Sequence, residues 1–150
     1  MTDTSTPVVA LDTSALMAPV EANVRLFEEL DRLLGTYEAV VPAAVRSELN
    51  GLTSGAGTAA TAASVGADLA ERAETIGVDG ADAAGETSPV DGAGAAGDNT
   101  YADDALVGLA VTGRVDYVVT NDRPLIERVL DTDTPVICLR GRTTLAITEP

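Results

Sequence analysis

Two aspartates follow apolar runs of this chain at points where buried strands are expected to end. Asp12 comes directly after Val8–Leu11, and Asp122 comes shortly after Tyr117–Val119. Short apolar runs of this kind are typical of strands buried in a parallel sheet. Parallel strands present their carboxyl ends at one edge of the sheet, where ligands bind in such folds. Both carboxylates are therefore expected at that edge, and they converge if the two strands lie close together.

Two further acids lie in predicted helices whose neighbouring loops could reach the same edge. Glu48 lies in Ala43–Leu49, a short helix that begins at Pro42, and Asp104 lies in the first turn of a helix that continues to Val111. Three or four unpaired carboxylates in one place are unfavourable, because like charges at close range raise one another's pKa. A divalent cation would remove this repulsion.

The residue inventory restricts the chemistry that such a site can perform. The chain has no His, no Lys and no Trp, and its single cysteine cannot form an internal disulfide or a zinc site. Histidine general bases, Ser-His-Asp triads and Schiff-base lysines are thereby excluded. A site of oxygen ligands alone suits Mg²⁺ or Mn²⁺. The expected reaction is phosphodiester hydrolysis by a metal-activated water, which needs no other nucleophile.

Each acid also has a purely structural interpretation. Asp12 and Asp122 could cap the turn or helix that follows them, and Asp103 and Asp104 could stabilise a helix N-terminus through the helix dipole. Glu48 could be a solvated surface acid. The joint interpretation is favoured because the succession of an apolar strand and an acid occurs twice.

The remaining pattern predicts strands that alternate with helices. Strands are expected at 8–11, 37–41, 117–119, 135–139 and, as a short edge strand, 145–147; helices are expected at 22–34, 43–49, 58–76, 103–111 and 124–130. This alternation implies βαβ units, so the predicted fold class is α/β, a three-layer α/β/α sandwich with a central, mainly parallel sheet. At 150 residues and 45% hydrophobic content, one domain over 1–150 is expected, with a long mobile Gly/Ala/Asp loop at about 77–99.

Acidic residues far outnumber basic ones. The 24 Asp and Glu against nine Arg give a net charge of -15 and an isoelectric point near 4.1. Self-repulsion of this size is tolerable in molar salt, where the Debye length is about 3 Å, so we expect a protein of a halophilic cytoplasm. The N-terminal MTDTSTP has neither a basic region nor an apolar core, and no stretch approaches ~20 apolar residues, so neither export nor membrane insertion is expected. Cys138 is expected as a small apolar residue in a buried strand.

The motifs occur in the order found in PIN-domain nucleases. They are Asp12-Thr13-Ser14 after an apolar strand, Val41-Pro42 leading to Glu48-Leu49, Ala102-Asp103-Asp104 with Leu106 and Ala110, and Val119-Thr120-Asn121-Asp122. The stretch Thr100–Val107 looks especially like the branch of the family that processes small-subunit ribosomal RNA, and the last third of the chain is similar to that branch too. The chain thus resembles this family over nearly its whole length, except 53–99.

The resemblance implies a set of four metal ligands. By it, Asp12, Glu48, Asp104 and Asp122 would bind Mg²⁺ or Mn²⁺ and form the catalytic centre. Adjacent residues on a helix point about 100° apart, so only one aspartate of the Asp103-Asp104 pair is expected to face the metal. Asp104 is the predicted ligand, because Ala105-Leu106 follows it as in the family. Five residues are expected to support the ligands: Asp103 and, through hydrogen bonds, Thr13, Ser14, Thr120 and Asn121.

The implied activity is a metal-dependent endoribonuclease, with a role in ribosomal RNA processing as the first interpretation. A toxin ribonuclease of the VapC type, held inactive by an antitoxin, would have the same four acids and is an alternative. A second alternative is a non-catalytic PIN-like scaffold that binds RNA or ribosome-assembly factors. PIN nucleases are often dimeric, so a homodimer is also expected by resemblance.

Four arginines lie near the predicted site segments: Arg46, Arg123, Arg140 and Arg142. Their guanidinium groups could bind RNA phosphates in bidentate fashion. Alternatively they pair with the abundant surface acids.

Overall fold

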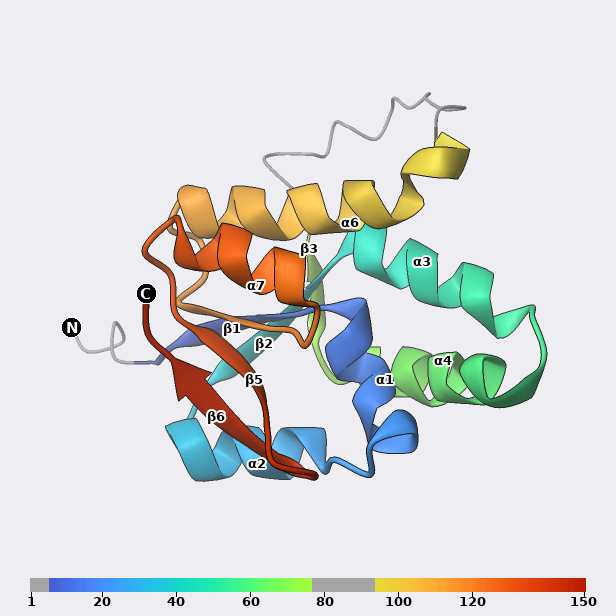
Figure 1. Cartoon of the computed structure of the whole chain (residues 1–150), viewed down its shortest axis with the longest axis horizontal. Coiled ribbons are helices and arrows are strands. Elements are labelled where there is room, and N and C mark those ends of the chain that lie inside the picture. The colour runs from blue at the N-terminus through green and yellow to red at the C-terminus, as the bar shows by residue number, and fades with distance from the viewer. Residues whose placement is uncertain (1–5, 77–93) are drawn as a thin grey trace.

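The computed structural model describes residues 6–76 and 94–150, and the side chains of 6–76 and 102–150. Its elements in chain order are β1 (Val8–Leu11), α1 (Thr13–Glu21), α2 (Leu26–Leu34), β2 (Glu38–Pro42), α3 (Ala43–Thr53), α4 (Gly57–Ala70), β3 (Glu74–Ile76), α6 (Gly94–Val111), β4 (Tyr117–Val119), α7 (Arg123–Leu130), β5 (Val136–Arg140) and β6 (Thr144–Thr148). They form a central sheet flanked by helices (Figure 1). The predicted α/β class is confirmed.

The six strands have the order β3-β2-β1-β4-β5-β6. Neighbouring strands are parallel except β6, which runs antiparallel to β5 at the edge. The chain moves outward from β1 to β2 and β3, and from β4 in the opposite direction to β5. Because parallel crossovers are right-handed, these two directions place helices on opposite faces; Figure 1 shows α6 and α7 on one side of the sheet and α1, α2 and α4 on the other.

The reversal of strand order falls between β1 and β4, the two strands that carry Asp12 and Asp122 at their ends. These strands pair from Val9↔Tyr117 to Leu11↔Val119. In open α/β sheets, ligands bind outside the carboxyl ends of the strands at such a switch point. The fold therefore places the ends of both strands where the sequence predicts the site.

Three predicted elements differ from the structure. The helix expected at 22–34 begins later, as α2 at Leu26, and a helix that was not predicted, α1, comes before it. Residues Ala15–Ala18 of α1 are all buried, so α1 lacks the one-sided apolar pattern of a surface helix. The helix expected at 58–76 ends at Ala70, and Glu74–Ile76 forms β3, an edge strand too short to show an alternating pattern. Helix α6 begins at Gly94, before its predicted start; the rest of the predicted loop, 77–93, lies outside the described residues.

The core includes a close crossing of α1 and α4. Ala62, Ala63 and Gly66 form the buried face of α4 together with Ala70. A Cβ added at Gly66 would lie 3.0 Å from the backbone oxygen of Leu16, so any other residue here would push the two helices apart by a few tenths of an ångström. Cys138 lies in β5 as predicted but is half-buried. Within 6–76 and 94–150, no helix is long and apolar enough to cross a membrane.

Candidate active site

Asp12 lies between the carboxyl ends of β1 and β4. Its backbone N–H donates to the Val119 carbonyl at 3.0 Å, which continues the β1–β4 ladder by one residue. Only 4% of Asp12 is exposed. A buried carboxylate is costly unless hydrogen bonds compensate it, so the polar groups around Asp12 determine whether it can hold a charge.

Three donors surround the Asp12 carboxylate. Oδ1 accepts from the backbone N–H of Thr13 at 2.6 Å. Oδ2 accepts from Thr120 Oγ1 at 2.6 Å and from Ser14 Oγ at 2.8 Å. Burial raises the pKa of Asp12, and these hydrogen bonds oppose the rise. The donors therefore favour the charged form in a place where burial disfavours it.

The two hydroxyls are themselves oriented by the turn after β4. The backbone N–H of Asn121 donates to Ser14 Oγ at 3.0 Å, and that of Asp122 donates to Thr120 Oγ1 at 3.1 Å. Because an ionised carboxylate only accepts hydrogen bonds, both hydroxyls donate to Asp12 while their oxygens accept these backbone N–H groups. Ser14 and Thr120 thus both hydrogen-bond the Asp12 carboxylate.

Glu48 and Thr13 connect α3 to the same edge. Thr13 Oγ1 donates to Glu48 Oε1 at 2.7 Å, although the two residues come from different helices.

Asp122 is the N-cap of α7, where its Oδ2 accepts from Leu125 N at 3.2 Å. The capping role considered for Asp122 is therefore real, and one oxygen of this exposed side chain is used for it.

The structure brings Asp103, and not Asp104, to the acidic cluster. Burial, and after it the charges of Asp12, Asp122 and Glu48, together raise the pKa of Asp103 from 3.8 to about 6, against the opposing charge of Arg128. These three acids are the ones that the sequence assigned to the site. Asp103 is thus electrostatically coupled to all of them, which the choice of Asp104 did not anticipate.

Asp104 instead faces solvent on α6. Its Oδ1 binds Arg128 of α7 at 2.8 Å, and its side chain is 56% exposed. The sequence could have predicted the exposure of Asp104, because the apolar residues Ala102, Leu106 and Ala110 form the buried face of α6. At 100° per residue, Asp104 lies on the opposite side of the helix from that face, whereas Asp103 lies at its margin.

The donor set fits a hard divalent cation. It consists of carboxylates with supporting hydroxyls, and Mg²⁺ and Mn²⁺ prefer such oxygen ligands. Within the described part of the chain, no three side chains of ligand type lie close enough to enclose a metal ion. Mg²⁺ usually keeps several waters and binds through one or two carboxylates, which an open arrangement of this kind allows.

The predicted phosphate-binding arginines differ in their partners. Arg46 donates to Glu71 at 2.7 Å, so an acid already engages its guanidinium. Arg123, Arg140 and Arg142 are exposed and form no ion pair with any residue that the structure describes. The three arginines near the ends of β4 and β5 therefore lack an acidic partner there.

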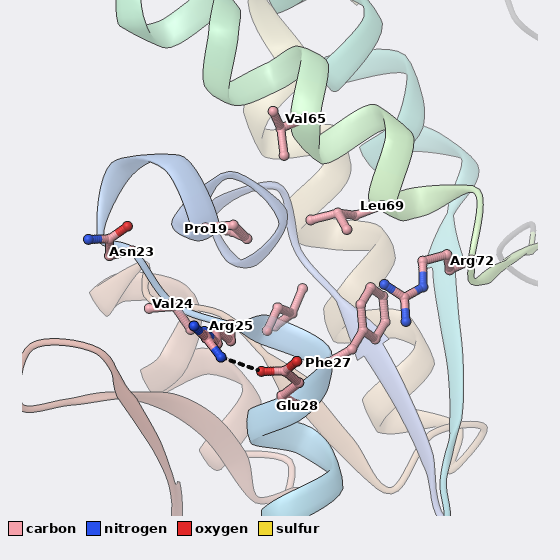
Figure 2. Close-up of a pocket in the computed structure, with 10 residues that line it drawn as sticks. Pro19, Asn23, Val24, Arg25, Phe27, Glu28, Val65, Leu69 and Arg72 are labelled. Carbon is pink, nitrogen blue, oxygen red and sulfur yellow. Dashed lines mark hydrogen bonds and ion pairs between the residues drawn. The ribbon is translucent and has the colours of Figure 1, made fainter.

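A hollow of about 420 Å³ lies elsewhere, between the end of α1, the start of α2 and α4 (Figure 2). None of the candidate site residues lines it. In it, the guanidinium of Arg72 stacks over the Phe27 ring, 4.3 Å from the ring centroid. This hollow is separate from the acidic cluster, which lies at the open edge of the sheet.

The fold agrees with the comparisons with known proteins. The PIN-like domain family matches residues 9–142, so this chain belongs to that family, whose members are generally nucleases. A solved structure of the PIN domain endonuclease Utp24 is similar over 95% of this chain and 92% of that one, with a TM-score of 0.68 and 21% identity. No curated protein matches the sequence.

Proposed function

We propose that this protein is a metal-dependent ribonuclease that hydrolyses RNA phosphodiester bonds at Asp12, Glu48, Asp103 and Asp122. The observation that carries the proposal is that the charges of Asp12, Asp122 and Glu48, which come from different elements near the switch point between β1 and β4, all raise the pKa of Asp103. The fold likeness to an endonuclease supports the reaction class. Negative charge that raises the pKa of Asp103 is unfavourable by itself, and a bound divalent cation would neutralise it.

The chain's own residues would hold the site in its charged, oriented form. Asp12 is fixed by the hydroxyls of Ser14 and Thr120, and Glu48 is fixed by the hydroxyl of Thr13. A bound Mg²⁺ or Mn²⁺ would supply an activated water and neutralise charge on the leaving oxygen. The absence of His and Lys leaves no other residue of the usual kind for this chemistry.

The substrate must approach a protein of net charge -15. Arg123, Arg140 and Arg142 lie close in sequence to the ends of β4 and β5 and have no acidic partner among the described residues. Guanidinium groups bind phosphate oxygens in bidentate geometry. We assign these three arginines to the RNA backbone and leave Arg46 to its pair with Glu71.

The proposal is tested with structured and unstructured RNA in high KCl and Mn²⁺, beside Asp12→Asn and an EDTA control. The wild-type protein is expected to cut, and Asp12→Asn to lose at least about 100-fold in rate, on the order of 3 kcal/mol of transition-state stabilisation. If neither protein cuts any RNA, a non-catalytic scaffold is the correct interpretation. If both cut equally, the activity does not come from this site.

A further inference from the structure

The side chain of Asn121 extends the sheet beyond the end of β4. The N–H of Thr120 donates to the Ile137 carbonyl at 3.1 Å, and the next β5 group that faces β4 in a parallel ladder is the N–H of Leu139. The chain turns away after Thr120, and Asn121 Oδ1 accepts from Leu139 N at 2.7 Å. A side-chain carbonyl thus takes the place of the missing backbone carbonyl.

The opposite edge of the β5–β6 hairpin is closed at the same level. Leu139 lies across from Leu145 in the hairpin. The N–H of Leu145 donates to Glu29 Oε1 at 3.0 Å, and Arg32 donates both to the Leu145 carbonyl at 2.8 Å and to Glu29 at 2.7 Å. Side chains of α2 and of the β4–α7 turn therefore fix the hairpin from both sides just before its tip.

The tip that follows carries two arginines. Arg140 comes directly after Leu139, and Arg142 lies in the turn that Gly141 makes with a φ of 83°. Both arginines are exposed and have no ion pair with a described residue, whereas Arg32, Arg46 and others each hold an acid. Because β5 runs parallel to β1 and β4, its carboxyl end lies at the same edge of the sheet as Asp12.

We propose that Asn121 is a positioning residue for RNA binding, which holds the end of β5 so that Arg140 meets a phosphate beside the acidic cluster. The inference rests on the proposed function and names a residue that acts through another. The backbone N–H of Asn121 binds Ser14, so one residue connects the Asp12 network with the hairpin. Without its side-chain acceptor, the half-buried Leu139 N–H loses its partner and the tip gains conformational freedom.

Amide exchange tests the contact independently of RNA. Asn121→Leu keeps the size of the side chain but removes the acceptor, and Asn121→Asp keeps an acceptor oxygen. By NMR on the full-length protein, the Leu139 amide is expected to exchange at least about tenfold faster in Asn121→Leu, the loss of about one net hydrogen bond, and to stay slow in Asn121→Asp. Equal protection in the wild type and Asn121→Leu would overturn the proposal.

RNA affinity tests the consequence. Fluorescence anisotropy with a labelled single-stranded RNA, in EDTA over a KCl series, compares the wild type, Asn121→Leu, Arg140→Ala and the double variant. We expect each single variant to weaken binding several-fold and to lower the slope of log affinity against log salt by about 1, the signature of one lost phosphate contact. The double variant is expected to bind no more weakly than Arg140→Ala. Arg25→Ala, which removes a charge paired with Glu28 on α2, is the control.

The outcomes separate this inference from the proposed function. Wild-type affinity and slope in Asn121→Leu, or losses that add in the double variant, would overturn the role of Asn121 while leaving RNA binding intact. If the wild-type protein binds no RNA at any KCl concentration, the proposed function fails and this inference fails with it.

Discussion

Asp103 and Asp104 are consecutive on α6 but belong to different electrostatic environments. Asp103 is coupled to the carboxylates of Asp12, Asp122 and Glu48, whereas Asp104 pairs with Arg128 at 2.8 Å on the exposed side of α6. One step along a helix turns the side chain by about 100°, which is enough to separate a site residue from a surface ion pair. The two positions are therefore a matched pair for experiment.

Asp103→Asn is expected to stabilise the metal-free protein at neutral pH. The pKa of Asp103 is raised from 3.8 to about 6, chiefly by burial. Since the native state then holds a proton that the unfolded chain has released, stability falls as pH rises from about 4 through about 6. After allowance for solvent screening, the gain on removing the charge is about 1 kcal/mol.

Urea unfolding of the wild type, Asp103→Asn and Asp104→Asn in EDTA between about pH 4 and pH 8 measures this effect. Asp104→Asn loses only an exposed ion pair and is expected to change stability by less than about 1 kcal/mol at any pH. Parallel pH profiles for the wild type and Asp103→Asn would show that Asp103 is not coupled to the cluster.

Mn²⁺ is expected to stabilise the wild-type protein more than Asp103→Asn. A ligand that binds only the native state adds about 2.7 kcal/mol at 100 times its Kd, and removing one carboxylate weakens that binding. Thermal unfolding over a series of Mn²⁺ concentrations, with EDTA to reverse the effect, gives the two curves. Identical Mn²⁺-dependent shifts in Tm would place the ion elsewhere.

Gly66→Ala is expected to destabilise the α1–α4 crossing. Its Cβ would lie 3.0 Å from the Leu16 carbonyl oxygen, so the backbones must separate. Overpacking of this kind costs roughly 1–3 kcal/mol, which exceeds the gain in helix propensity of up to about 1 kcal/mol. Gly51→Ala on α3 is the control, because nothing lies within 4 Å of its added Cβ. It should stabilise the protein, and a stable Gly66→Ala would mean that the helices adjust freely.

Sequence patterns predicted the elements whose residues follow a simple apolar pattern. The runs before Asp12 and Asp122 predict β1 and β4 because fully buried parallel strands are continuously apolar. Helix α1 and strand β3 were not predicted, for two different reasons: α1 is apolar on most sides, and β3 is three residues long. Neither has the one-sided or alternating pattern on which such predictions depend.

The sequence predicted the two strands that end at Asp12 and near Asp122. It did not predict which hydrogen bonds the neighbouring polar side chains form. The family resemblance implies Ser14 and Thr120 as supporting residues of the acids, and in the structure both donate to Asp12. The side chain of Asn121 was expected to support the acids, but it binds Leu139 instead, since β4 ends one rung before β5 does. Which strand ends first depends on tertiary structure, and no local pattern records it.

Stability is expected to rise steeply with salt. At a net charge of -15, repulsion among exposed acids opposes folding at low ionic strength, and molar KCl shortens the Debye length to about 3 Å. Thermal unfolding between about 0.1 and 1 M KCl, over which the Debye length falls from about 10 to about 3 Å, is expected to show a continuous rise in Tm. A Tm that does not change with KCl would contradict adaptation of this surface to high salt.

The most direct test of the acidic site compares RNA hydrolysis by the wild type, Asp103→Asn and Asp104→Asn in Mn²⁺ and high KCl. We predict that Asp103→Asn loses about 100-fold or more in rate, on the order of 3 kcal/mol, while Asp104→Asn stays within a few-fold of the wild type. Loss of cleavage in Asp104→Asn with full activity in Asp103→Asn would contradict the site described above.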